Sequence, residues 1–184
     1  MEKSIILIGM PGAGKSTVGV LLAKAVGLPF IDTDLLIQAE EKGLLQEIIN
    51  AKGLENFLKI EERVVLKRSL KKCVVATGGS VVYSSRAMGK LKDNGLVVYL
   101  KLDFEEIQKR IKNITTRGIA MGEGKSLRDI YDERVPLYEK YSDIIVNCSG
   151  KSVEKVVKTI MEEISAVLQS GIPCVTLKGA IPKT

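Results

Sequence analysis

The sequence predicts an α/β fold in which helices cover both faces of a parallel sheet. Short apolar, β-branched runs alternate along the chain with longer segments whose apolar residues repeat at helical spacing, which is typical of a doubly wound sheet. A glycine-rich segment joins the first such run, residues 4–8, to the first helical segment, residues 17–24. The length of 184 residues favours one domain with a full core.

The glycine-rich segment has the phosphate-loop pattern G-x-x-x-x-G-K-[ST], and it reads Gly9-Met10-Pro11-Gly12-Ala13-Gly14-Lys15-Ser16. Its glycines let backbone N–H groups turn around phosphate oxygens, and the following helix adds a favourable dipole. We therefore expect Lys15 to reach the β- and γ-phosphates and Ser16 to ligate magnesium. The expected nucleotide-binding residues are Gly12, Ala13, Gly14, Lys15, Ser16 and Thr17. A glycine turn that matches by chance is the alternative, and the flanking strand and helix argue against it.

Two carboxylates follow the second predicted strand. A break at residues 27–29 ends the first helix, and the strand that begins at Phe30 runs into Asp32-Thr33-Asp34. Ligands of open parallel sheets bind at the carboxyl ends of the strands, so both aspartates are expected near the phosphate loop. One could hold magnesium and the other could orient or deprotonate a hydroxyl. The alternative is that they only cap the helix predicted at residues 35–41.

Residues 35–72 predict two or three helices, with breaks at Gly43 and at Lys52-Gly53. These helices form an insertion between the second and third strands. The last of them, residues 54–70, is expected to be amphipathic. Its apolar side carries Phe57, Ile60 and Val64, and the residues expected to face a cleft or water are Glu61, Glu62 and Arg63.

Two adjacent glycines, Gly78 and Gly79, follow the third strand, residues 73–77, and allow the backbone to approach a ligand closely. An ordinary tight turn is the alternative. A helix at residues 84–94 and a strand at 96–102 come next, and Asp103 is a natural cap for the helix at 104–111.

Residues 112–126 lack periodicity and contain three glycines, which predicts a mobile lid over bound phosphates. Arg117 within it could place a cation on the charge that develops in phosphoryl transfer. An ordinary surface loop is the alternative.

A helix that carries Arg134 begins at residue 127 and ends at 138 or 141. It is followed by a strand at 144–147, a helix at 152–168 and an unpatterned tail.

The amino-acid composition limits which side chains can act in catalysis or bind a metal. The chain has no histidine, so acid–base work falls to carboxylates or lysines, and its three cysteines lack metal-ligand spacing. With no apolar run of spanning length and no cleavable leader, we expect a soluble, cytoplasmic protein that does not bind membranes. The charge of +6 could suggest nucleic acid, but basic and acidic residues are interleaved. The densest basic group, residues 67–72, is better explained as a solvated helix end, so no nucleic-acid partner is expected.

In their order, these motifs resemble those of the shikimate kinase family over nearly the whole chain. The resemblance is carried by residues 9–19, by Phe30-Ile31-Asp32-Thr33-Asp34, by Ala76-Thr77-Gly78-Gly79, by Arg117 and by Arg134-Val135-Pro136-Leu137-Tyr138. It implies one three-layer P-loop kinase domain, residues 1–168, with a central five-stranded parallel sheet and a tail at 169–184. Within this domain, the implied substrate-binding helices lie at about 35–70 and the lid at about 112–126. The implied reaction transfers the γ-phosphate of ATP, with Mg²⁺, to the 3-hydroxyl of shikimate in aromatic amino-acid synthesis.

The resemblance also implies residue roles. Asp34 would contact the shikimate hydroxyls as base or orienting group, while Asp32 and Ser16 would serve magnesium. Shikimate would be bound by the backbone at Gly78 and Gly79 and by Arg134 on its carboxylate, and ATP by Arg117 on the phosphates and Arg110 on the adenine side. Lys15, Asp34 and Arg117 are thus the expected catalytic residues of a protein expected to be monomeric.

Three positions depart from the family pattern. Leu58 stands where an arginine is expected to grip the substrate carboxylate, and Lys59 points about 100° away from it on a helix. Ser80 replaces a third glycine, and residues 117–120 read Arg-Gly-Ile-Ala in place of Arg-Pro-Leu-Leu. Two alternatives therefore stay open: a related kinase for another small alcohol, such as a hydroxy amino acid or polyol, and a non-catalytic nucleotide-binding protein.

Overall fold

A five-stranded sheet in the order β2-β3-β1-β4-β5 forms the centre of the molecule, and all of its strand pairs are parallel. The computed structural model describes residues 3–111, 119–122 and 124–169. The strands are β1 (Ser4–Ile8), β2 (Phe30–Asp32), β3 (Val74–Ala76), β4 (Gly95–Lys101) and β5 (Ile144–Asn147). The α/β class and the five parallel strands expected from the sequence are confirmed.

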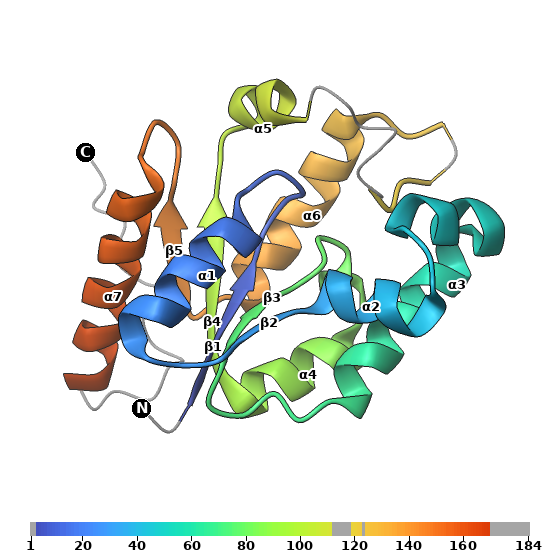
Figure 1. Ribbon diagram of the computed structural model, residues 1–184. Helices are drawn as coiled ribbons and strands as arrows, with labels where there is room; N and C mark the ends of the chain where they lie inside the picture. The colour runs from blue at the N-terminus through green and yellow to red at the C-terminus, as the bar shows by residue number, and fades with distance from the viewer. Residues whose placement is uncertain (1–2, 112–118, 123, 170–184) are drawn as a thin grey trace.

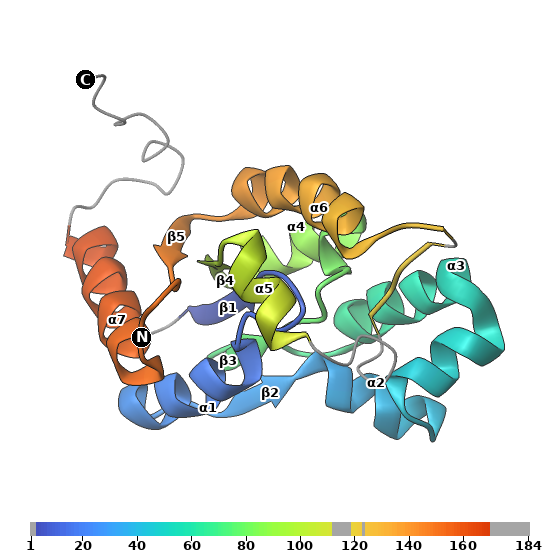
Figure 2. The ribbon, with the colours of Figure 1, turned by 90° about the horizontal axis from the view of Figure 1, so that it is seen from above.

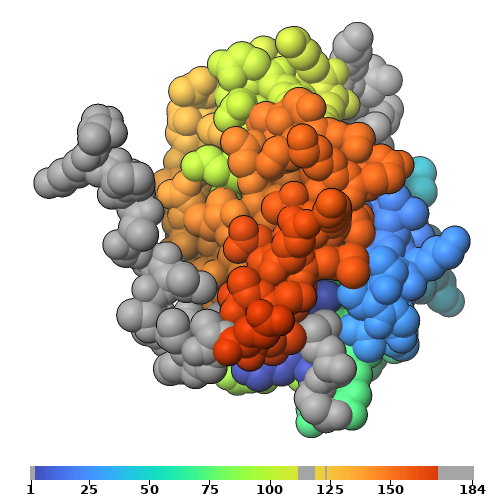
Figure 3. Space-filling view, turned by 90° about the vertical axis from the view of Figure 1, so that its left-hand side faces the viewer, coloured from blue at the N-terminus to red at the C-terminus, as the bar shows by residue number. Residues whose placement is uncertain are grey.

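Helices cover both faces of this sheet, so that the domain has three layers (Figures 1 and 2). One face carries α1 (Lys15–Val26) and α7 (Val153–Gln169), which lie side by side in Figure 3. The other face carries α4 (Ser85–Asn94) and α6 (Leu127–Tyr141), while α5 (Phe104–Arg110) follows the carboxyl end of β4. The helices α2 (Thr33–Glu41) and α3 (Leu45–Lys67) and the 3₁₀ turn η1 (Val81–Tyr83) complete the described elements.

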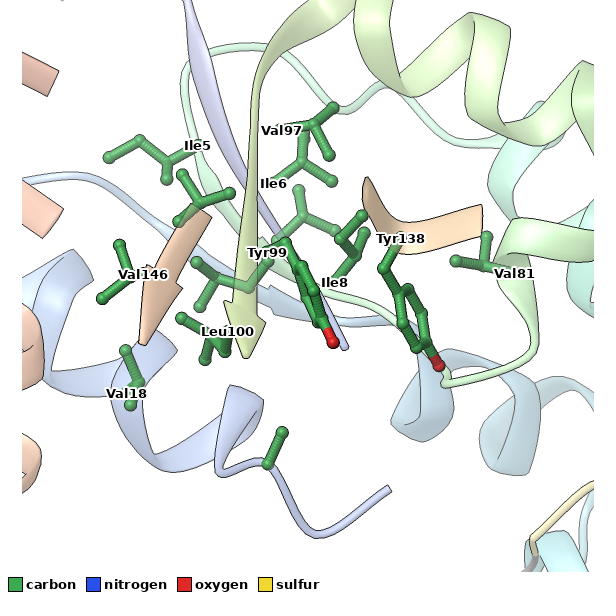
Figure 4. Packing of buried hydrophobic residues seen from close by; sticks show 14 of the residues in the cluster. Ile5, Ile6, Ile8, Val18, Val81, Val97, Tyr99, Leu100, Tyr138 and Val146 are labelled. Carbon is green, nitrogen blue, oxygen red and sulfur yellow. The ribbon is translucent and has the colours of Figure 1, made fainter. Parts of the chain in front are cut away.

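The three central strands, β1, β3 and β4, are almost wholly buried because helices pack on both sides of them. Ile5, Ile6, Leu7 and Ile8 of β1 are 0% exposed, which explains why this strand is a continuous apolar run rather than an alternating one. Beside them the rings of Tyr99 and Tyr138 stack, with centroids 5.1 Å apart and planes at 27°. Figure 4 shows that both tyrosine hydroxyls point toward the carboxyl end of β4, which the tip of its arrow marks.

The predicted helical insertion lies beyond the β2 edge of the sheet (Figure 2). The predicted breaks are confirmed: Gly43 separates α2 from α3, and Gly53, with φ 76° and ψ 163°, kinks α3. The insertion has its own apolar cluster, which includes Phe57, Ile60 and Val64 as expected and also Ala120 from the predicted lid segment.

The helix α3 ends at Lys67, three residues before the predicted end at residue 70. Lys67 and Arg68 lie 3.8 and 2.8 Å from the carboxylate of Glu40 on α2. Two of the basic residues at this helix end are therefore partly neutralised within the fold.

Some predicted features lie outside the described residues. These are Arg117 with most of the predicted lid, and the tail from residue 170 onward. None of the described helices combines the length and the apolar character that a membrane crossing requires.

Candidate functional site

The phosphate loop connects β1 directly to α1. Gly9 has φ +144°, and a Cβ there would lie 2.8 Å from the carbonyl oxygen of Leu100 on β4, so only glycine fits between the two strands. Gly14 caps α1 with φ +89° and has no side chain to cover the first turn of the helix. The amides of this turn are consequently open to an anion, which is the arrangement that the sequence motif predicts.

Lys15 is folded across the mouth of the loop. Its ammonium donates to the carbonyl oxygens of Gly9 at 2.8 Å and Met10 at 2.9 Å, and the residue is 8% exposed. Burial lowers the pKa of Lys15 to about 8, and the carboxylates of Asp34 and Asp32 partly oppose that shift. The ammonium is thus desolvated and poised to exchange carbonyl oxygens for phosphate oxygens.

Asp32 combines the two roles that the sequence left open. One carboxylate oxygen accepts from the backbone N–H of Asp34 at 2.9 Å and so caps α2, while the other accepts from the Ser16 hydroxyl at 2.6 Å. The cap fixes the carboxylate at the end of β2, and the second bond brings it to the predicted magnesium ligand, Ser16. Capping and metal binding are therefore compatible at this residue.

The Ser16 hydroxyl and the Asp32 carboxylate suit a magnesium ion whose other ligands would be water and nucleotide phosphates. Mg²⁺ prefers carboxylate, hydroxyl, water and phosphate oxygens and is usually held by one or two protein ligands. Among the residues that the structure describes, no group of three or more carboxylates or cysteines could form an all-protein metal cage. Ser16 and Asp32 thus fit the expected cofactor.

A cavity of about 490 Å³ opens over the first turn of α1, and it is lined by Gly12, Gly14, Lys15, Ser16, Thr17 and Arg110. Arg110 comes from α5 and donates from Nη1 to the carbonyl oxygen of Gly12 at 3.5 Å, while Nη2 pairs with Glu106. The described residues that line this cavity are thus brought together from the phosphate loop, α1 and α5. Ala13 of the same loop is buried at 2% exposure, which leaves only its backbone for such a role.

Asp34 lies in the first turn of α2, partly buried beside Lys15. Burial raises the pKa of Asp34 to about 6, against the opposing attraction of Lys15. A carboxylate with this pKa is ionised at neutral pH but is basic enough to accept a proton or a strong hydrogen bond. The Asp34 carboxylate and the phosphate-loop lysine therefore share one site.

The backbone of Gly78 is closed in by side chains. Its N–H donates to the buried hydroxyl of Thr33 at 3.0 Å, and a Cβ there would lie 2.0 Å from Oε1 of Glu61 and 2.9 Å from Oδ1 of Asp34. A turn is present, since the N–H of Val81 donates to the carbonyl oxygen of Gly78 at 3.5 Å, and the glycine is needed in it to admit the two carboxyl groups.

Arg134 is the largest fully buried side chain, with 1% exposure. Its Nε donates to the Tyr83 hydroxyl at 3.1 Å, its Nη2 donates to the carbonyl oxygen of Ala120, and its guanidinium lies 5.1 Å from the Tyr83 ring centroid. Nη1 would lie 3.2 Å from a Cβ on Gly79. A guanidinium fixed in this way by Tyr83 and Ala120 presents a pre-organised cation to the backbone at Gly79.

Three residues of the site were not predicted as functional. Glu61 lines a small cavity, as the expectation of a cleft or water allows, but it is only 2% exposed and its Oε1 has no hydrogen-bond partner. Burial raises the pKa of Glu61 to about 7, and the negative charge of Asp34 raises it further. A hydrogen bond from Ser80 and the positive charges of Arg134 and Lys15 act in the opposite direction. Tyr138 donates to the carbonyl oxygen of Gly79 at 2.6 Å, and Tyr83 holds Arg134. The available sequence signal was the helical phase of Glu61, which lies four residues after Phe57 and three before Val64 on the predicted apolar side.

Comparisons with known proteins agree on one family. The family model described as shikimate kinase matches residues 11–165. The chain is 35% identical over 164 residues to a shikimate kinase of Persephonella marina, across 88% of this chain and 99% of the relative. The structure of a shikimate kinase from Acinetobacter baumannii in complex with shikimate has a TM-score of 0.81 at 28% identity and covers 93% of this chain and 96% of its own. The crystal structure of the Aquifex aeolicus shikimate kinase has a TM-score of 0.75 at 30% identity, and the match covers 91% of this chain and 99% of that chain.

Proposed function

The chain belongs to the shikimate kinase family, and we propose that the residues at the carboxyl ends of its strands carry out the family's reaction. The protein is an ATP- and Mg²⁺-dependent kinase that transfers the γ-phosphate of ATP to the 3-hydroxyl of shikimate. The observation that carries the assignment of roles is that Asp32 accepts both from the Ser16 hydroxyl and from the backbone N–H of Asp34, because these bonds join the phosphate side and the acceptor side in one site.

On the nucleotide side, the backbone amides of residues 12–17 bind phosphate oxygens and the Lys15 ammonium binds the β- and γ-phosphates. Ser16 and Asp32 hold Mg²⁺, which neutralises phosphate charge when it is bound. Arg110 lies beside the loop and contacts the adenine side. Arg117, outside the described residues, is proposed to place its guanidinium on the transferred phosphoryl group.

On the acceptor side, Asp34 orients the hydroxyl that attacks and accepts its proton, a role that the raised pKa of this carboxyl supports. Gly79 binds the substrate through its backbone, and the neighbouring Gly78 makes room for the two carboxyl groups. Arg134 binds the substrate carboxylate, supported by its burial and by its fixed plane. Catalysis is then mainly positioning and electrostatic stabilisation, without a covalent intermediate.

The test is steady-state release of ADP with Mg²⁺ and ATP. Shikimate is compared with homoserine, serine, threonine and gluconate as acceptors, and the ADP released with no acceptor is subtracted. We expect shikimate to give by far the highest kcat/KM. Turnover on another alcohol with none on shikimate would contradict the proposal and would favour the alternative that Leu58 and Ser80 suggest.

We further propose that the protein acts as a monomer in the cytoplasm and that residues 1–168 form its single catalytic domain. The α2–α3 insertion supplies the acceptor side, and residues 112–126 act as the lid. Gel filtration with light scattering would test the oligomeric state.

A further inference from the structure

An acceptor that carries a carboxylate needs cationic partners, and the proposed function gives it Arg134. In this chain Arg134 is already engaged by Tyr83 and by the Ala120 carbonyl. A second cation is expected, because a carboxylate offers about four acceptor positions and is bound most strongly by several charged donors. Position 58 does not supply it, since Leu58 is apolar.

Leu58 and Tyr83 line two small cavities that differ in charge: the first has an excess of carboxylates, and the second has one lysine and one glutamate. The first, of about 200 Å³, is lined by Glu55, Lys59, Glu61, Glu62, Ser80 and Ser84 in addition to those two residues. Its three glutamates outnumber its one lysine, and Lys59 is paired with Glu55 at 2.7 Å. This cavity therefore disfavours an anion.

The second cavity, of about 230 Å³, contains Lys125 and Glu133, and it is otherwise lined by apolar side chains, the Tyr83 ring and Gly122. The Lys125 ammonium donates to Glu133 at 2.5 Å, and its side chain is 46% exposed. An ammonium has three N–H donors, so that it can keep this bond and still donate to a ligand carboxylate. The glutamate also holds the long lysine side chain beside the cavity.

Lys125 and Arg134 are positioned by the same structural unit. The N–H of Lys125 donates to the carbonyl oxygen of Gly122 at 3.1 Å, and the next residue, Ser126, caps the helix α6 that carries Arg134. The Tyr83 side chain connects the two cations, since its hydroxyl accepts from Arg134 and the residue lines the cavity of Lys125. This arrangement fits a flat, anionic acceptor group held from two sides.

We propose that Lys125 binds the carboxylate of the acceptor together with Arg134 and so replaces the arginine that is absent at position 58. The inference rests on the proposed function and assigns this carboxylate contact to a residue near the carboxyl end of the predicted lid segment. Lys59, although next to Leu58 in sequence, is not the replacement, because it is paired with Glu55 beside two further glutamates.

The test compares Lys125→Met with the wild type on two acceptors: shikimate and its methyl ester, which lacks the charge. For shikimate we expect KM to rise about tenfold, the effect of losing one charge-assisted hydrogen bond, with kcat and the KM for ATP changed less than about twofold. For the methyl ester, wild type and variant should agree. Lys158→Met on α7 is the matched control, since it removes an exposed, ion-paired lysine far from the acceptor.

Two further variants make the test decisive. Adding Leu58→Arg to Lys125→Met should restore a low KM for shikimate, whereas Lys59→Met should leave that KM unchanged. An unchanged KM in Lys125→Met, an equal rise with the methyl ester, or a rise in Lys59→Met instead would overturn the inference. In each of these cases the wild type still phosphorylates shikimate. A wild type that does not phosphorylate shikimate would instead overturn the proposed function and this inference with it.

Discussion

Asp34 and Glu61 direct their carboxyl groups at the same point in the molecule, the space above Gly78. A Cβ built on that glycine would lie 2.9 Å from Oδ1 of Asp34 and 2.0 Å from Oε1 of Glu61. Burial is the largest cause of the raised pKa of each carboxyl group, Asp34 adds to the increase at Glu61, and Lys15 opposes both. The two carboxyl groups thus share one desolvated space next to the proposed acceptor hydroxyl.

Replacing Asp34 with asparagine should lower kcat by about 10²–10⁴-fold, because the amide cannot accept the hydroxyl proton. The affinity for MgATP should change little, since the ion is assigned to Ser16 and Asp32. ADP release and isothermal titration with a non-hydrolysable ATP analogue measure the two effects. Asp32→Asn is the paired variant and should weaken MgATP binding. A collapse of nucleotide binding in Asp34→Asn would move Asp34 into the metal site.

The pH dependence of kcat/KM should be bell-shaped. Below about 6 the Asp34 carboxyl is protonated and cannot act as base, so activity rises as the pH increases through that value. Above about 8 the Lys15 ammonium of the free enzyme loses its charge, so activity falls. In the pH profile of kcat, the decrease in activity should begin at a higher pH, because bound phosphates stabilise the charged form of Lys15. If the activity of Asp34→Asn still rose with pH through about 6, Asp34 would not be the group responsible for that part of the profile.

Replacing Glu61 with glutamine should stabilise the substrate-free protein at neutral pH. The pKa of Glu61 is raised from 4.5 to about 7, so the folded state retains a proton that the unfolded state releases between those values. Stability is therefore lost as the pH rises through this window, by on the order of 1–3 kcal/mol. The gain in the glutamine variant should be small near pH 4.5 and largest above about 7, where ionised Glu61 has an unpartnered oxygen.

Urea unfolding of wild type and Glu61→Gln at several pH values measures this difference. Glu62→Gln is the control, because Glu62 is the next residue of α3 and pairs with Ser84 and Arg86. A stability difference that is the same at every pH would rule out ionisation of Glu61 as its cause.

Replacing Gly78 with alanine should disturb the acceptor side, since the new Cβ would overlap Oε1 of Glu61. We expect a loss of about 1–3 kcal/mol in unfolding free energy and a higher KM for shikimate, with the KM for ATP nearly unchanged. Gly89→Ala on α4 is the control, because its Cβ would meet nothing within 4 Å and should stabilise the helix. Wild-type stability and KM in Gly78→Ala would show that the carboxyl groups move aside freely.

The sequence by itself determined the fold class and the nucleotide site. Strand and helix periods are local properties, and the phosphate loop needs glycines, Lys15 and Ser16 at fixed spacing within one turn between a strand and a helix. The same reasoning located the breaks at Gly43 and Gly53, because backbone preferences act residue by residue. For Asp32, the sequence offered cap or metal ligand as alternatives, and the structure shows that one carboxylate can use an oxygen for each.

Only the tertiary structure decided what surrounds the acceptor. Glu61 is buried against Gly78, and Tyr83, on the turn after β3, holds Arg134 of α6. Lys125 reaches the same cavity as Leu58 although the two are far apart in the chain. These contacts depend on how α3, η1 and α6 pack around the sheet, and no local pattern encodes that packing. The charge of a buried group is set by its neighbours in space, so the chemistry of the acceptor site follows from the assembled fold.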